Sequence, residues 1–119
     1  MPIQELNKQK CRPCEGGQPP LSEAEALALL KQLPGWALSD SKNGIWKAFN
    51  MKGFLSAVRL IDVIARVAEA EDHHPDLHLT GYRNLRIELS THSIGGLSQN
   101  DFILAAKIEG LPKELKLSS

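Results

Sequence analysis

The residues best suited to chemistry in this chain are its histidines. Three of the four, His73, His74 and His92, fall at the expected edges of structural elements, whereas His78 falls inside an expected strand. Imidazole has an unperturbed pKa of about 6.5, so it gives and takes protons near neutral pH. A cluster of such groups suits a reaction that protonates a leaving hydroxyl and removes a proton elsewhere.

The surroundings of the paired histidines add geometric support. Glu69 precedes His73 by four residues, so on a continuing helix its carboxylate would orient that imidazole. His73 and His74 would diverge by about 100° on a helix, which predicts different roles for them. Pro75 biases His74 away from helical angles and would aim its ring into a cleft at the helix end.

Each candidate also has a purely structural interpretation. The histidine pair would be favourably placed against the dipole at a helix C-terminus, and His92 would be an exposed residue at a strand end. Asp101 is explained better as a helix cap than as a catalyst. Glu69 would be a solvated surface residue, and Trp36 and Tyr82 would be core aromatics.

The two cysteines, Cys11 and Cys14, form half of a zinc knuckle or a redox pair, but no second pair follows them. We expect a leader without metal; zinc completed by a histidine or shared between subunits is the alternative. A metal-dependent enzyme built on the histidines is a further alternative. It lacks the H-x-x-x-H spacing that places two ligands on one helical face.

The apolar pattern predicts the elements that position these residues. Residues 1–20 form an irregular leader, and the capping pair Ser22 and Glu25 then starts a helix. Phe54 to Glu71 is the strongest helix, with Phe54, Val58, Ile61, Ala65 and Ala68 on its expected apolar face. The other expected elements are strands at 36–39, 45–51, 77–80 and 83–91, and a helix at 98–109 capped by Ser98 with Asp101.

This order predicts an α+β fold, a four-stranded antiparallel sheet with three helices packed on one face. We expect one domain over residues 21–112, between the leader and a polar tail at 113–119. The chain has 119 residues, of which 42% are hydrophobic, and its 14 basic residues balance its 14 acidic ones. We therefore expect a cytoplasmic protein that binds neither nucleic acid directly nor membrane.

Seven residues of the candidate site recur at a spacing that is typical of one family: Glu69, His73-His74-Pro75, Tyr82, His92 and Asp101. At these positions the sequence resembles the pterin-4a-carbinolamine dehydratases. The resemblance continues upstream through Pro34-Gly35-Trp36 and covers roughly residues 21 to 110, so it leaves out the cysteine leader and the C-terminal tail. It implies the same α+β fold.

The resemblance implies dehydration of 4a-hydroxytetrahydropterin to quinonoid dihydropterin, in the recycling of the pterin cofactor of aromatic amino acid hydroxylases. It implies no metal and no bound cofactor, because the pterin is the substrate. His73 and His92 would be general acids on the 4a-hydroxyl, from either face of the pterin. His74 would bind the ring and accept the N5 proton.

The remaining roles also come from the resemblance. Glu69 would orient His73, Trp36 would line the pocket, and Asp101 would orient its surroundings through the helix cap, with Tyr82 as a further orienting residue. Family members assemble as homodimers or homotetramers. Some proteins of this fold are instead non-catalytic binding modules, either transcriptional coactivators or enzyme assembly factors, and this is the alternative function.

Overall fold

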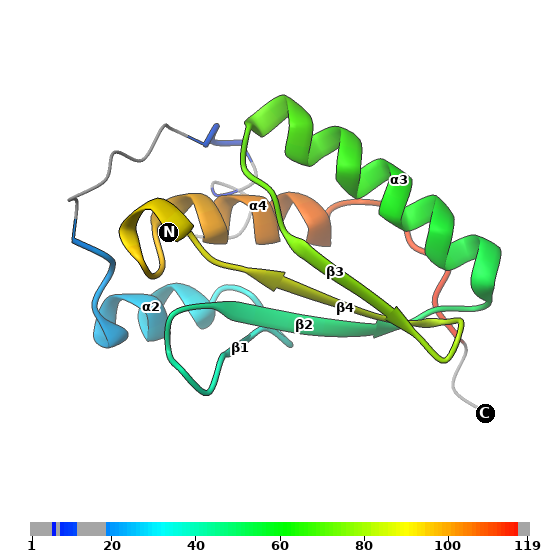
Figure 1. Cartoon of the computed structure of the whole chain (residues 1–119), viewed down its shortest axis with the longest axis horizontal. Coiled ribbons are helices and arrows are strands. Elements are labelled where there is room, and N and C mark those ends of the chain that lie inside the picture. The colour runs from blue at the N-terminus through cyan, green and yellow to red at the C-terminus, as the bar shows by residue number, and fades with distance from the viewer. Residues whose placement is uncertain (1–5, 7, 12–18, 117–119) are drawn as a thin grey trace.

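The computed structural model describes Leu6, residues 8–11 and residues 19–116. Within this part of the chain the predicted order of three helices and four strands is confirmed (Figure 1). A 3₁₀ turn, η1, is inserted before the last helix. The elements are α2 (Glu23–Leu30), β1 (Ala37–Leu38), β2 (Ile45–Asn50), α3 (Phe54–Glu71), β3 (Asp76–Thr80), β4 (Asn84–Leu89), η1 (His92–Ile94) and α4 (Gln99–Glu109).

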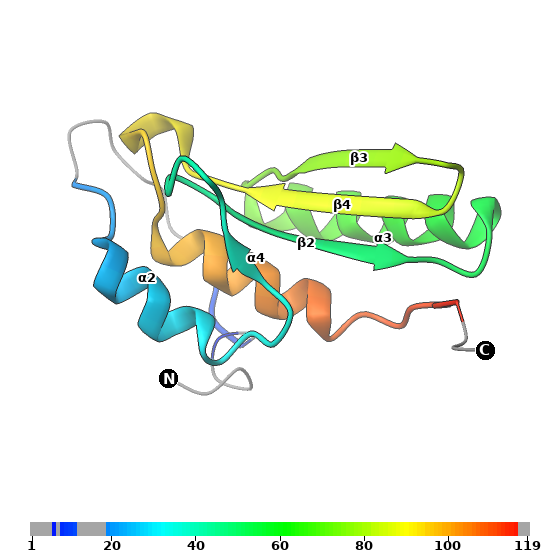
Figure 2. The same cartoon turned by 90° about the horizontal axis from the view of Figure 1, so that it is seen from below.

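The four strands form one antiparallel sheet in the order β1-β2-β4-β3. Both views show α3 and α4 against one face of this sheet, while α2 packs beside β1 (Figure 2). Along β4, Leu85, Ile87 and Leu89 are buried while the residues between them are more exposed. This alternation follows from the period of two in a strand, and it is the pattern that predicted β4.

Both predicted capping boxes are present. The Ser22 hydroxyl accepts a hydrogen bond from the Glu25 backbone N–H, and the Glu25 carboxylate accepts one from the Ser22 N–H. Ser98 and Asp101 make the corresponding pair at the start of α4. These bonds satisfy backbone donors that a helix N-terminus leaves unpaired, so each helix start is specified locally.

The bounds predicted for α3 are confirmed, but its predicted buried face is wrong except at Ala68 and, in part, at Ile61. The side chains that face the core are those of Ala57, Leu60, Ile64 and Ala68, whereas Phe54 and Val58 are exposed. The helix carries more apolar residues than one face can bury, so two overlapping stripes fit the sequence pattern. Packing against the sheet and α4 selects one of them.

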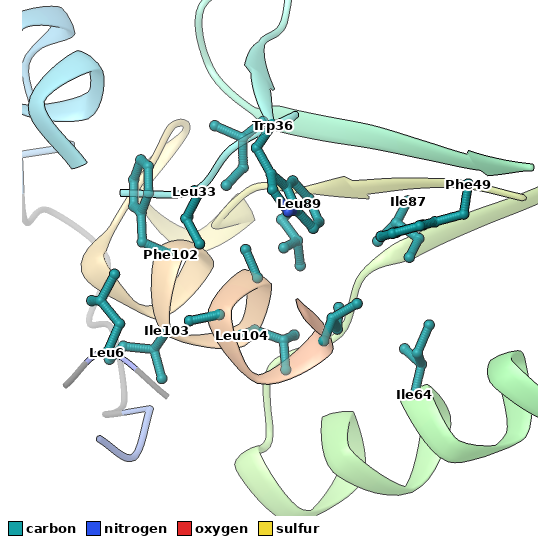
Figure 3. Packing of buried hydrophobic residues seen from close by; sticks show 14 of the residues in the cluster. Leu6, Leu33, Trp36, Phe49, Ile64, Ile87, Leu89, Phe102, Ile103 and Leu104 are labelled. Atoms are coloured by element: carbon teal, nitrogen blue, oxygen red, sulfur yellow. The ribbon is translucent and has the colours of Figure 1, made fainter. Parts of the chain in front are cut away.

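The core lies between the sheet and the helices. It contains residues from all three helices and from β2 and β4, and Figure 3 shows part of this packing. Helix α4 is buried along almost its whole length, with Phe102 and Leu104 inaccessible to solvent. It is therefore the central helix of the domain. No helix in the described ranges is long and apolar enough to cross a membrane.

The antiparallel pairing of β3 with β4 brings two distant segments to one end of the sheet. Asp76 at the start of β3 pairs with Glu88 near the end of β4. The residues just before β3 and just after β4 therefore lie near each other. These two segments carry His73, His74 and His92.

Candidate active site

A left-handed residue at the end of α3 directs the paired histidines. Asp72 has φ 52° and ψ 41°, a conformation that aspartate tolerates better than most residues. The His73 N–H then donates to the Ala68 carbonyl and the Asp72 N–H to the Glu69 carbonyl. This is the hydrogen-bond pattern of a Schellman motif, which ends the helix before the first histidine.

His73 forms a buried pair with Asp101. Its Nε2 lies 2.6 Å from Asp101 Oδ1, and the two side chains are only 10% and 0% exposed. The second carboxylate oxygen, Oδ2, accepts from the Thr91 hydroxyl at 2.9 Å and from the Ser98 backbone N–H at 3.0 Å. Asp101 is thus both the predicted cap of α4 and the residue that fixes the imidazole of His73.

The predicted pairing of Glu69 with His73 is wrong. Glu69 Oε1 instead lies 2.8 Å from His74 Nε2, and both side chains are exposed, by 78% and 54% respectively. The reason is the left-handed Asp72, because it removes His73 from the helical position one turn after Glu69. The two histidines after α3 are therefore each paired with a carboxylate, His73 in a buried pair and His74 in one open to water.

A cavity of about 550 Å³ lies at this end of the sheet and brings the three predicted histidines together. His73 and His74 line it from the end of α3, and His92 lines it from the first position of η1. The other residues that line it come from the leader, α3, the segment after β4 and α4: Cys11, Ala70, Glu71, Asp72, Ser90, Thr91, Ser93 and Asn100. The fourth histidine, His78, lies on β3 near Glu88 and does not line the cavity.

Four predicted site residues do not line this cavity. Glu69 and Asp101 contact histidines that line it, whereas Trp36 and Tyr82 lie away from it. Trp36 is buried in the core, and its indole N–H donates to Glu109 Oε1 at 2.8 Å. Tyr82 is exposed in the turn that joins β3 to β4, at the opposite end of those strands from the histidines. Within a single chain neither aromatic ring is placed to line the pocket.

Among the described residues, no group of three or more histidine, cysteine, aspartate or glutamate side chains is arranged to hold a metal ion. Cys11 is a free thiol beside the cavity. Cys14 lies outside the described residues, so the predicted leader pair is described only in part.

Sequence reasoning missed Thr91, and it considered Cys11 only as a zinc ligand or as half of a redox pair. Thr91 supports Asp101 from the segment after β4, and Cys11 reaches the cavity from the leader. The role of Thr91 could not be predicted, because it depends on the contact between Asp101, the capping residue of α4, and His73. Cys11 offered no local signal, because its place depends on contacts with residues 60 and 89 positions away.

Comparison with known proteins identifies the family. Residues 19–111 match the family model described as pterin 4 alpha carbinolamine dehydratase. A Nitrosomonas eutropha protein named "Putative pterin-4-alpha-carbinolamine dehydratase" is 49% identical over 92% of this chain and 95% of its own length. The mitochondrial pterin-4-alpha-carbinolamine dehydratase 2 of Arabidopsis thaliana is 40% identical over 94% of this chain and 62% of its own.

A solved structure gives the same result for the fold. The transcriptional coactivator/pterin dehydratase from Brucella melitensis superposes with a TM-score of 0.71 and is 32% identical, over 76% of this chain and 95% of that one. The family model and the named relatives identify the protein as an enzyme of the hydro-lyase class. The chain belongs to the pterin-4a-carbinolamine dehydratase family.

Proposed function

We propose that this protein dehydrates 4a-hydroxytetrahydropterin and that His73, His74 and His92 carry the proton transfers. In this reaction the C4a–O bond breaks, the leaving hydroxyl takes up a proton to form water, and N5 loses its proton as the N5=C4a double bond forms. The observation that carries the proposal is the cavity that all three imidazoles line. Its volume of about 550 Å³ lies in the range of small-molecule sites.

The different environments of the histidines support different roles. His73 is held in one orientation by the buried Asp101, which suits a general acid that must meet the 4a-hydroxyl in a defined geometry. His92 approaches from the segment after β4, so we assign it as a second acid on the other face of the pterin. His74 is more exposed to solvent than His73, and we assign it as the base that accepts the N5 proton.

Every proton in this scheme moves between the pterin, imidazole and water, so the proposed reaction uses no metal and no bound cofactor. General acid–base catalysis typically contributes about 10²- to 10⁴-fold in rate. A contribution of that size is useful for an elimination that also proceeds slowly without an enzyme. The products are water and quinonoid dihydropterin.

A coupled dehydratase assay tests the proposal, with 4a-hydroxytetrahydropterin generated in place by a hydroxylase. The variants His74→Ala and His92→Ala should each lower kcat by about 10²-fold. His78→Ala is the matched control, because His78 lies on β3 outside the cavity, and it should retain the wild-type rate. Full activity in His74→Ala would overturn the assignment.

A second role in protein binding is favoured by one surface feature. Phe54, Leu55 and Val58 are exposed together over about 100° of the first turns of α3. An exposed apolar patch on a helix marks a surface that another protein covers. The Brucella melitensis relative, described as a transcriptional coactivator as well as a dehydratase, is consistent with such a role.

For this patch we propose self-association into a dimer or tetramer. The molar mass measured by light scattering should then exceed that of one chain and fall towards it in Leu55→Glu. A wild-type protein that is monomeric at all concentrations would refute self-association. A purely non-catalytic binding module would keep its function in the histidine variants, which separates it from the enzyme.

A further inference from the structure

The described part of the leader is packed onto the domain. Leu6 is fully buried and belongs to the hydrophobic core cluster. Figure 3 shows its side chain at the α4 end of that cluster, towards Ile103. The Gln99 side-chain amide donates to Gln9 Oε1 at 3.2 Å, which links the leader to the first residue of α4. The described leader residues, Leu6 and residues 8–11, are therefore anchored at several points.

Cys11 connects the two helices that hold the buried pair of the site. Its backbone N–H donates to Glu71 Oε1 at 2.9 Å, at the last residue of α3. Its thiol donates to the Asn100 carbonyl at 3.6 Å, in the first turn of α4. Glu71 comes two residues before His73, and Asn100 comes directly before Asp101. Cys11 thus links the C-terminal end of α3 to the N-terminal end of α4, and there it borders the histidine cavity.

The thiol offers an uncharged surface to this cavity. Burial and the negative charge of Glu71 raise the pKa of Cys11 to about 12, so the thiolate is rare at neutral pH. Protonated cysteine behaves as a small hydrophobic residue with a weak donor. That chemistry suits contact with a flat, uncharged heterocycle, and it does not suit nucleophilic attack.

We propose that Cys11, at the end of the described leader residues 8–11, forms part of one wall of the substrate pocket and is a specificity-determining residue that contacts the pterin. This inference rests on the proposed function for the identity of the substrate. The size and neutrality of Cys11 set the room available to the ring, while the histidines carry the proton transfers. Substitutions that enlarge or charge the side chain at Cys11 should therefore change KM, whereas substitutions at the histidines should change kcat.

A size series at Cys11 tests the wall in the dehydratase assay. Cys11→Ser keeps the size and a donor for the Asn100 carbonyl, so its KM should stay within about twofold of wild type. Cys11→Phe adds a ring where the substrate would lie, so KM should rise about tenfold or more with kcat within about threefold. Lys10→Ala, an exposed neighbour on the same segment, is the control and should change neither constant.

Two results of this series would refute the proposal that Cys11 forms a wall of the substrate pocket. One is a wild-type KM in Cys11→Phe, because a ring at a true wall must compete with the substrate. The other is a loss in Cys11→Ser as large as that in Cys11→Phe, because it would show that the thiol acts chemically. Circular dichroism on each variant confirms that the domain is folded.

Alkylation gives a second readout that does not depend on turnover. In Cys14→Ser protein, Cys11 is the single cysteine of the chain. Saturating 7,8-dihydrobiopterin should slow its reaction with iodoacetamide by about fivefold or more, and an unchanged rate would refute contact between Cys11 and the pterin. Protection of Cys11 in a protein without dehydratase activity would refute the proposed function but support contact between Cys11 and the pterin. The failure of one proposal can therefore be distinguished from the failure of the other.

Discussion

The change of Asp101 to asparagine tests the buried pair of the site directly. Asp101 Oδ1 lies 2.6 Å from His73 Nε2, in a place that water hardly reaches. Asparagine has nearly the same shape as aspartate but no charge. The substitution therefore keeps the space around His73 filled while it removes the ionised acceptor from the imidazole.

The expected size of the effect follows from this hydrogen bond. A bond to a charged group contributes about 1.5–3 kcal/mol, and a neutral one about 0.5–1.5 kcal/mol. The difference of about 1–2 kcal/mol corresponds to a fall in kcat of about five- to thirtyfold if it is felt in the transition state. Asparagine also cannot accept on both oxygens, so a buried donor is left unpaired and the free energy of unfolding falls by about 1–3 kcal/mol.

The matched control is Thr91→Val, because the Thr91 hydroxyl donates to the other carboxylate oxygen, Oδ2, at 2.9 Å. It should lower the free energy of unfolding by a similar amount with a much smaller change in kcat. Urea unfolding measures the first quantity and the coupled assay the second, at a temperature where all variants are folded. A full kcat in Asp101→Asn, or an equal loss in Thr91→Val, would refute the role of the buried pair.

Three further predictions concern other parts of the molecule. Glu69→Gln should change kcat by no more than about fivefold in the coupled assay, since an exposed ion pair contributes about 0–1 kcal/mol; a hundredfold loss would contradict this. Ile64→Ala should lower the free energy of unfolding in urea by about 2–5 kcal/mol because it empties a buried position, and a change below 1 kcal/mol would be inconsistent with the packing. The raised pKa of Cys11 stabilises the fold below its ordinary value of 9.0, and this contribution is lost as pH rises towards about 12. Between pH 9.0 and about 12, the melting temperature of wild type should therefore fall relative to that of Cys11→Ala. A difference between the two melting temperatures that does not depend on pH would contradict this.

Local signals predicted much of this fold. The bounds of α3 and both capping boxes could be found from the sequence because they depend on residues three or four positions apart. The pairings of β1 with β2 and of β3 with β4 join strands that follow each other in the chain. In each case the residues that determine the structure are neighbours in the chain.

The contacts that the sequence did not predict depend on tertiary structure. Glu69 pairs with His74 because Asp72 adopts a left-handed conformation, which helical spacing alone does not reveal. For Trp36 the sequence left both the core and the pocket open. Trp36 lies in the core, where Glu109, far along the chain, accepts its indole N–H. The packing of the leader likewise depends on Leu6, which was not expected to belong to the core.

The histidine cluster itself could be predicted, because its members stand at the ends of elements that the sheet topology brings together. The identity of each carboxylate partner could not. Asp101 was expected to cap α4 and to orient its surroundings, but His73 was not named as its partner. Its Oδ2 accepts from the Ser98 N–H as a cap, and its Oδ1 pairs with His73. One residue therefore links the local start of α4 to the chemistry of the site.

The most direct test of the central claim is the dehydration rate of a protein in which all three cavity histidines are replaced together. The rate of 4a-hydroxytetrahydropterin dehydration by His73→Ala/His74→Ala/His92→Ala should fall to that of the reaction without enzyme, while wild type accelerates it. A folded triple variant that retains the wild-type rate would contradict the account, because the histidines would then not carry the proton transfers.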